Sequence, residues 1–303
     1  MSRVNRCFEL LKKRELFWKI KEKISVCFIK NKIIKNNILE DREYRRLYKK
    51  YYKVIKDRNI TDNMKDGDKV WVFWYQGIDS APILVKKCIE SIKKTFNDKE
   101  VIILTKDNYE KYIEFPEYIM KKFKNGNISF THFSDLLRIS LLAEYGGIWC
   151  DATLYFTGSV PDYVKDANLF VFKNINLDRN DEFPIVASSW FMVSKSNNDI
   201  IVATRDLLYE YHRKEKYLKN YFLIHLFFTM ATKKYRDLWD KVPTFSNVNP
   251  HILQFELLNQ YNEERYNQIK QISFVHKLNK CIIGEKKNTF YDYIVRGKNE
   301  KRN

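Results

Sequence analysis

The sequence predicts an α/β fold built on a parallel sheet, and three features of the chain lead to this expectation. A short apolar run at 70–74, rich in β-branched and aromatic residues, is typical of a buried strand. A helical stretch follows from Pro82 to about Phe96, and a second apolar run comes next at 101–104. Such a strand-helix-strand order favours neighbouring parallel strands joined by a right-handed crossover.

The later elements continue this alternation until the chain becomes mostly helical. Those expected before residue 198 are helices at 116–123 and 133–145 and strands at 148–150, 169–172 and 190–193. Those expected after it are helices at 199–214, 217–234 and 252–261 and a short strand or loop at 273–276. The expected fold is therefore an α/β domain with helical additions in its C-terminal half.

Composition excludes several classes of protein. Hydrophobic residues make up 45% of the 303 residues, which is enough for a sizeable core and excludes general disorder. The five cysteines are scattered and odd in number, so neither a disulfide framework nor a zinc cluster is expected. No apolar run reaches the roughly 18 residues of a membrane-spanning helix, and the N-terminus lacks a clear signal sequence. We therefore expect a cytoplasmic protein.

The distribution of charge predicts the domain boundaries. The formal net charge is +17, and residues 1–60 carry 19 Lys and Arg against 7 Asp and Glu, whereas the remaining residues are almost balanced. We expect a basic helical extension at 1–62, an α/β domain at 63–284 and a polar tail at 285–303.

The extension has the pattern of a basic amphipathic helix. Its apolar positions recur every three or four residues, with lysines between them, at Phe17, Ile20, Ile24 and Phe28. Such a helix suits an anionic membrane surface, and an apolar stripe packed on the main domain is the alternative. No nucleic-acid-binding motif accompanies the basic charge, so we expect no nucleic-acid partner.

The most informative motif joins a helix to a strand. Asp135 and Arg138 lie one turn apart on the helix expected at 133–145, so both side chains should point the same way. A Gly-Gly pair then permits a sharp exit, and Asp151 follows at the carboxyl end of a strand, where open α/β sheets bind ligands. A carboxylate there can hold a divalent cation that stabilises a departing diphosphate. A surface ion pair and a turn-capping aspartate are the alternatives.

Five segments of the chain form a recognisable set, namely 75–77, 132–138, 145–153, 189–191 and 275–278. Together they resemble the bacterial capsular polysaccharide synthesis proteins, which are related to glycosyltransferase family 32 and to the glycosylating clostridial toxins. The resemblance runs from about Val70 to about Leu278. It implies a GT-A-type, Rossmann-like glycosyltransferase fold, a nucleotide-sugar donor and a divalent metal, Mn²⁺ or Mg²⁺.

The resemblance also implies roles for individual residues. Asp135 and Arg138 match the family's sugar-contacting acid and arginine, and Asp151 matches the first acid of its Asp-X-Asp metal motif. Thr153 stands where the second acid is usual, so the expected metal site needs another ligand. His276 is the candidate because a neutral imidazole can ligate a transition metal, and a histidine that is hydrogen-bonded in a late strand is the alternative.

Five further residues are candidates for contacts with the donor. Trp74 and Tyr75 offer flat surfaces for a uracil-like base, and Gln76 can bond the edge of that base. Lys277 can neutralise pyrophosphate, and Trp190 can stack on a sugar face. A place in the aromatic core is the alternative for Trp74.

These features predict a hexosyltransferase-like enzyme that moves a sugar from a nucleoside-diphosphate donor, with UDP as the expected nucleotide, to a growing surface-glycan intermediate. The expected acceptor is a polyprenyl-diphosphate-linked saccharide, and residues 1–60 would hold the enzyme peripherally on the inner face of the cell membrane. A non-catalytic scaffold of capsule assembly with a decayed sugar site is one alternative, favoured by the missing second acid. A toxin-like transferase that acts on a host protein is another.

Overall fold

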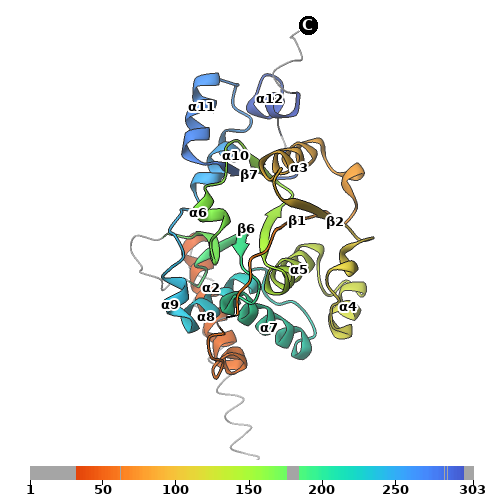
Figure 1. Cartoon of the computed structure of the whole chain (residues 1–303), viewed down its shortest axis with the longest axis vertical. Coiled ribbons are helices and arrows are strands. Elements are labelled where there is room, and N and C mark those ends of the chain that lie inside the picture. Colours follow the sequence, from red (N-terminus) through yellow and green to blue (C-terminus); the bar gives the residue numbers. More distant parts are fainter. Residues whose placement is uncertain (1–31, 62, 176–183, 283, 285, 297–303) are drawn as a thin grey trace, which may run out of the picture. The chain divides into compact units, whose positions relative to one another are not determined.

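The computed structural model describes residues 32–61, 63–175, 184–282, 284 and 286–296 (Figure 1). The chain divides into two compact units, residues 1–50 and residues 51–303. Helix α2 (Lys32–Tyr51) contains all the described residues of the first unit and enters the second at its last residue. The amphipathic stretch expected at 17–28 lies outside the described residues. Among the described residues, no helix is both long and apolar enough to cross a membrane.

The second unit is built on a five-stranded sheet with strand order β2-β1-β3-β6-β5. Its strands are β1 (Lys69–Phe73), β2 (Glu100–Leu104), β3 (Gly147–Asp151), β5 (Leu169–Lys173) and β6 (Ala187–Ser194). A separate two-stranded ribbon consists of β4 (Leu154–Phe156) and β7 (Val275–Lys277). β1 pairs in parallel with β2 and β3, whereas β6 runs antiparallel to β3 and β5. The predicted α/β class is confirmed, and the reversed direction of β6 is a feature that the sequence did not indicate.

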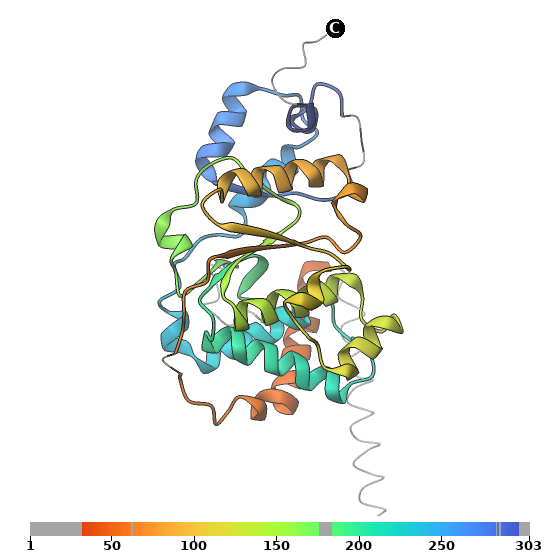
Figure 2. The ribbon, with the colours of Figure 1, turned by 45° about the vertical axis from the view of Figure 1, so that its right-hand side comes forward.

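Helices cover both faces of this sheet. The α-helices described in the second unit are α3 (Ile83–Thr95), α4 (Glu117–Lys124), α5 (Phe130–Glu144), α6 (Asp162–Lys165), α7 (Asp199–Lys214), α8 (Leu223–Lys234), α9 (Arg236–Trp239), α10 (Ile252–Glu256), α11 (Glu263–Ile272) and α12 (Phe290–Arg296). Figure 2 shows α3 on one face and α5 with α7 on the other. The apolar side of α3 packs through Val85, Ile89 and Ile92 on Val70 and Val72 of β1, so the helix expected after the first strand covers that strand.

The ribbon of β4 and β7 separates two hydrophobic cores. Leu154, Phe156 and Val275 belong to the core between α3 and the sheet. Tyr155, on the other face of β4, packs against a smaller core formed with α10, α11 and α12. Because side chains alternate along a strand, neighbouring residues of β7 must also face different cores. This alternation decides which residues of β7 can reach the site described below.

The predicted polar tail at 285–303 is partly wrong, because α12 lies within it. Phe290 and Ile294 are spaced four residues apart, share one face of α12 and are buried in the smaller core beside Tyr266. The polar residues around this pair masked its apolar spacing in the sequence. Residues up to Arg296 therefore belong to the folded domain.

The exit from α5 depends on two glycines, as the sequence predicts. Gly146 has a φ of +67° and Gly147 a φ of +92°, a region that other residues rarely adopt. A Cβ added to Gly147 would lie 2.2 Å from the carbonyl oxygen of Lys69 on β1. The glycines therefore set where β3 begins and, four residues later, where the side chain of Asp151 emerges.

Candidate active site

The candidate site lies at the carboxyl ends of β1 and β3. Phe73 and Asp151 are register partners, so the last residues of these two parallel strands are neighbours. Trp74 follows Phe73 directly, and Thr153 follows Asp151 after one residue. Strand pairing alone therefore brings the predicted base-binding segment and the predicted metal motif to one edge of the sheet.

Arg138 on α5 forms hydrogen bonds with residues of β3 and β6. Its Nη1 donates to the carbonyl oxygen of Ser189 at 2.7 Å and to the hydroxyl of the same residue at 2.5 Å. Its Nη2 lies 3.1 Å from Oδ1 of Asp151 and 3.4 Å from Oδ1 of Asp135. The guanidinium carbon lies 5.1 Å from the centre of the Trp149 ring. The structure thus brings the predicted Asp135 and Arg138 pair to Asp151.

Asp151 accepts hydrogen bonds from three side chains. Its Oδ1 accepts from Arg138 and, at 3.0 Å, from Nε1 of Trp149. Its Oδ2 accepts from Nζ of Lys277 at 2.9 Å. Burial acts to raise the pKa of this carboxyl, but the charges of Lys277 and Arg138 outweigh it and the pKa is lowered. Asp151 is therefore an anion at neutral pH, clamped between two cations.

Lys277 completes this cluster, whereas its neighbour His276 does not. Nζ of Lys277 lies 2.6 Å from Oγ1 of Thr153. His276 is fully buried on the opposite face of the ribbon, where its Nε2 lies 2.9 Å from Oγ1 of Thr157. Burial lowers the pKa of His276 to about 4, so the ring is neutral at pH 7. The structure therefore does not bring the predicted third metal ligand to Thr153.

These residues do not fit a divalent cation. Hard cations such as Mg²⁺ prefer several oxygen ligands with negative charge among them. Both oxygens of Asp151 already accept from protein cations, and the ammonium of Lys277 lies between Asp151 and Thr153. Within the described parts of the chain, no group of three or more His, Cys, Asp or Glu side chains could hold a metal ion. His276 does not join Asp151 and Thr153, so the described residues do not form the predicted three-ligand set, and the predicted Mn²⁺ or Mg²⁺ stays a prediction.

Exposure separates the cluster into an inner and an outer part. The side chains of Asp135 and Arg138 are only 8% and 6% exposed, whereas those of Asp151 and Lys277 are 22% and 21% exposed. A ligand would therefore meet Asp151 and Lys277 first. The predicted sugar contacts of Asp135 and Arg138 stay predictions, and what the structure shows is that Arg138 holds Asp151 from behind.

Three members of the cluster were not chosen from the sequence. Trp149 stands two residues before Asp151, so both side chains share a face of β3, a signal that strand periodicity carries. Ser189 belongs to one of the five segments of the resemblance, but only the fold shows that it accepts from Arg138. His225 lies 3.3 Å from Oγ of Ser189, and burial lowers its pKa to about 4, so it is neutral at pH 7. No pattern in the sequence indicated His225.

Comparison with known proteins shows the family of the chain. Residues 14–294 match the family of capsular polysaccharide synthesis proteins. The chain belongs to this family. The predicted resemblance is thereby confirmed, and the match reaches further in both directions than the five segments do.

Two individual proteins are similar to this family member. A segment of 102 residues, 31% of the chain, is 31% identical to the O-glycosyltransferase braB of Annulohypoxylon truncatum and covers 24% of that protein. The chain thus spans about a quarter of the length of that curated relative. In the solved structure of the PaToxG glycosyltransferase, the match covers 80% of this chain and 99% of that chain, with 16% identity and a TM-score of 0.39.

The structure corrects the assignment of Trp190 in this family member. The residue is 7% exposed, belongs to the core beside α3, and stacks on Phe172 with ring centroids 4.7 Å apart. The pairing of β5 with β6 is irregular here, so the strand does not present its residues in simple alternation. Ser189 faces Arg138, while the ring of the adjacent Trp190 is enclosed in the core.

The core position of Trp190 makes a testable prediction. Trp190→Ala should lower the free energy of unfolding by about 3–5 kcal/mol, because a large buried ring leaves a cavity. Urea unfolding followed by circular dichroism measures this loss. Phe255→Ala is the control, since this aromatic residue is 79% exposed and should change stability little. Equal stability of the two variants would contradict the assignment of Trp190 to the core.

The segment after β1 divides between core and surface. Trp74 is half-buried beside the larger core, and its Nε1 is a buried donor without a hydrogen-bond partner among the described residues. Tyr75 packs in an aromatic group, with its ring centroid 4.8 Å from that of Phe130. Gln76 is exposed. The predicted contacts of these residues with a base stay predictions.

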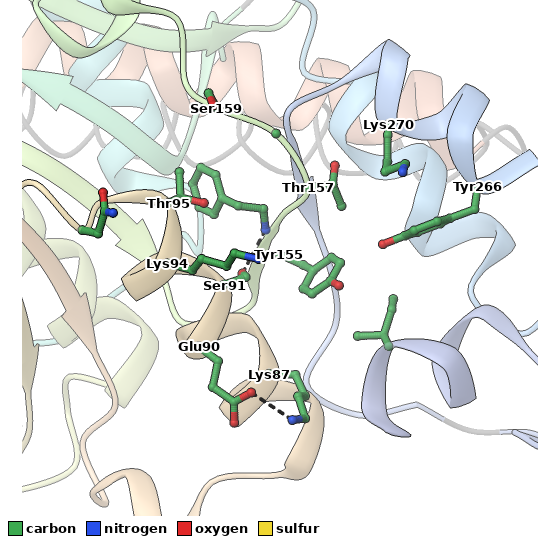
Figure 3. Close-up of a pocket in the computed structure, with 14 residues that line it drawn as sticks. Lys87, Glu90, Ser91, Lys94, Thr95, Tyr155, Thr157, Ser159, Tyr266 and Lys270 are labelled. Atoms are coloured by element: carbon green, nitrogen blue, oxygen red, sulfur yellow. Dashed lines mark hydrogen bonds and ion pairs between the residues drawn. The ribbon is translucent and has the colours of Figure 1, made fainter. Parts of the chain in front are cut away.

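A separate cavity of about 710 Å³ lies beside α3, α11 and α12 (Figure 3). Its basic and aromatic lining comes from Lys87, Lys94, Lys270, Tyr155 and Tyr266. Lys87 is neutralised by Glu90 at 2.9 Å, which Figure 3 shows as a dashed line. None of the residues predicted for the site lines this cavity, so it is distinct from the cluster around Asp151.

Proposed function

We propose that this family member is a glycosyltransferase that moves a sugar from a nucleoside-diphosphate donor, UDP in the first instance, to a growing capsule or surface polysaccharide intermediate. The observation that carries the proposal is the network of Arg138, Asp151 and Lys277 at the carboxyl ends of β1 and β3. Cations held in a defined place at this edge of a sheet suit a diphosphate. The family match and the O-glycosyltransferase relative support the same class of enzyme.

The chemistry follows from the charge that the reaction creates. The bond between the anomeric carbon and the oxygen of the β-phosphate breaks, and that oxygen keeps the electron pair. The hydroxyl oxygen of the acceptor forms the new bond to the anomeric carbon, and its proton passes to the departing diphosphate. Negative charge grows on the diphosphate, so cationic donors that are already in position stabilise the transition state. In this proposal Lys277 contacts the diphosphate, and Arg138 is a positioning residue for Asp151.

Recognition of the nucleotide base falls in this proposal to the segment after β1. The unpartnered Nε1 of Trp74 and the exposed amide of Gln76 stand next to the strand end that pairs with Asp151. A uracil presents carbonyl oxygens that accept from such donors, and its flat ring can stack on an indole. Tyr75 would act through the aromatic packing that holds this segment.

The acceptor that we propose is a polyprenyl-diphosphate-linked saccharide, reached from the inner face of the cell membrane through residues 1–60. The support is the surplus of 19 Lys and Arg over 7 Asp and Glu in that segment. The full chain should co-sediment with vesicles that contain phosphatidylserine and not with pure phosphatidylcholine vesicles. Replacing Lys19, Lys21 and Lys23 by Glu should weaken this binding, and equal binding to both kinds of vesicle would refute the membrane role.

A non-catalytic scaffold of capsule assembly is the second candidate function. It is favoured by Thr153 in place of a second acid and by the protein partners that both oxygens of Asp151 already have. The two functions separate when the full chain is incubated with a panel of nucleotide sugars and the released nucleoside diphosphate is measured. Release from a preferred donor supports the transferase. Absence of release, together with calorimetry that detects no nucleotide binding, supports the scaffold.

A further inference from the structure

The ammonium group of Lys277 bridges the two residues of the Asp-X-Thr motif. Its Nζ lies 2.9 Å from Oδ2 of Asp151 and 2.6 Å from Oγ1 of Thr153. These are the two side chains that the motif offers for binding a cation. The ammonium of Lys277, a cation that belongs to the chain itself, therefore lies where a free metal ion would contact the motif.

The fold holds Lys277 in this place from both sides of the ribbon. Lys277 is the register partner of Leu154 on β4, and the backbone N–H of Leu278 donates to the carbonyl oxygen of Thr153 at 3.0 Å. His276 is hydrogen-bonded to Thr157 on the opposite face, so the strand cannot rotate to exchange the two side chains without breaking that contact. The position of the ammonium is therefore set by strand register.

One N–H group of the Lys277 ammonium remains available to a ligand. A lysine ammonium has three N–H donors, and two of them are directed at Asp151 and Thr153. The side chain is 21% exposed, so the remaining donor can reach a ligand at the surface. A phosphate oxygen is the acceptor that suits it best, because both partners of the bond are then charged.

The four charged side chains of the cluster balance one another. Asp135 and Asp151 together carry two negative charges, and Arg138 and Lys277 carry two positive charges. A divalent cation at Asp151 would add two positive charges within contact of two others, and its ligands would have to be taken from Lys277. Anionic diphosphate, in contrast, adds the sign of charge that the exposed ammonium attracts.

We infer that Lys277 replaces the divalent cation of the related enzymes and that this chain binds and cleaves its donor without metal. The inference rests on the proposed transfer from a nucleoside diphosphate and names the group that stabilises the leaving diphosphate. Lys277 donates to an oxygen of the diphosphate, Asp151 and Thr153 hold the ammonium, and Arg138 holds Asp151.

The first test measures UDP binding to the full chain by calorimetry, once in EDTA and once with added Mn²⁺. UDP should bind equally well in both, and equilibrium dialysis of Mn²⁺ alone should find no site. Donor cleavage should likewise proceed at the same rate in EDTA and in Mn²⁺. These measurements on the unaltered protein remain decisive even where a variant fails to fold.

The second test replaces the ammonium itself. Lys277→Met keeps an unbranched side chain that is one atom shorter and removes its charge, so it should weaken UDP binding in EDTA roughly 10- to 100-fold. Lys195→Met is the matched control, because Nζ of Lys195 also pairs with an aspartate, at 2.8 Å from Asp66, and its side chain is similarly exposed at 28%. The control should bind UDP as the unaltered chain does.

The outcomes distinguish failure of this inference from failure of the proposed function. Cleavage that requires Mn²⁺ and survives Lys277→Met would overturn the role of Lys277 and leave the transferase standing. A chain that neither binds a nucleoside diphosphate nor cleaves any donor, with or without Mn²⁺, would remove the proposed function and this inference with it.

Discussion

Asp151→Asn should lower kcat/KM for donor cleavage by roughly 10²–10³-fold, an effect of the size seen when one fixed electrostatic group is lost from an active site. The substitution keeps the shape of the side chain and removes the charge that orients Lys277 and Arg138. Without that anion both cations lose their common partner, and the ammonium is no longer held toward the ligand. Release of nucleoside diphosphate from the preferred donor measures the loss, and circular dichroism confirms the fold.

The control for this variant is another aspartate paired with a lysine. Oδ1 of Asp162 lies 2.9 Å from Nζ of Lys165, but the side chain of Asp162 is 85% exposed and lies outside the cluster around Asp151. Exposed pairs of this type contribute little, so Asp162→Asn should retain full activity. Near-normal cleavage by a folded Asp151→Asn protein would show that the site has been assigned to the wrong residues.

Gly147→Ala should have the largest effect on stability, lowering the free energy of unfolding by more than about 3 kcal/mol. Two costs combine at this position. The φ of +92° is strained for alanine, and the new Cβ would lie 2.2 Å from the carbonyl oxygen of Lys69, so β1 and β3 must move apart. Urea unfolding gives the stability, and donor cleavage should fall further than the folded fraction does, because β3 carries Asp151.

Gly126→Ala isolates the backbone cost in this experiment. Gly126 has a φ of +72°, yet a Cβ there would meet nothing within 4 Å. Its replacement should cost only about 1 kcal/mol, which is the strain of the left-handed conformation alone. Equal losses in the two variants would mean that the approach of β3 to Lys69 is not the constraint that we infer.

Local patterns were sufficient for the elements that depend on neighbours in the chain. The first strand and helix were predicted because the apolar residues of 70–74 and of α3 have the spacing of buried elements. The pair of Asp135 and Arg138 was predicted because residues three apart on a helix must share a face. α12 was missed because only two of its residues, Phe290 and Ile294, form its buried face.

Long-range pairing decided what the sequence left open at the site. The sequence placed Asp151 correctly at a strand end, since the preceding glycines and the apolar run locate that end. The sequence analysis assigned both His276 and Lys277 to the site, although adjacent residues of a strand point to opposite faces. Pairing of β7 with β4 selects Lys277 for Asp151 and turns His276 into the interior.

The sequence by itself indicated the α/β class through the order of its elements and the family through five short segments. It also indicated that Asp135, Arg138 and Asp151 come together, because spacing within one segment, 132–153, is sufficient for that. Only the tertiary structure decided that Ser189 accepts from Arg138, that Trp190 is enclosed, and that the ammonium of Lys277 lies beside Asp151. Those contacts join segments 51 and 126 residues apart, and strand register and packing, which no local pattern encodes, bring them together.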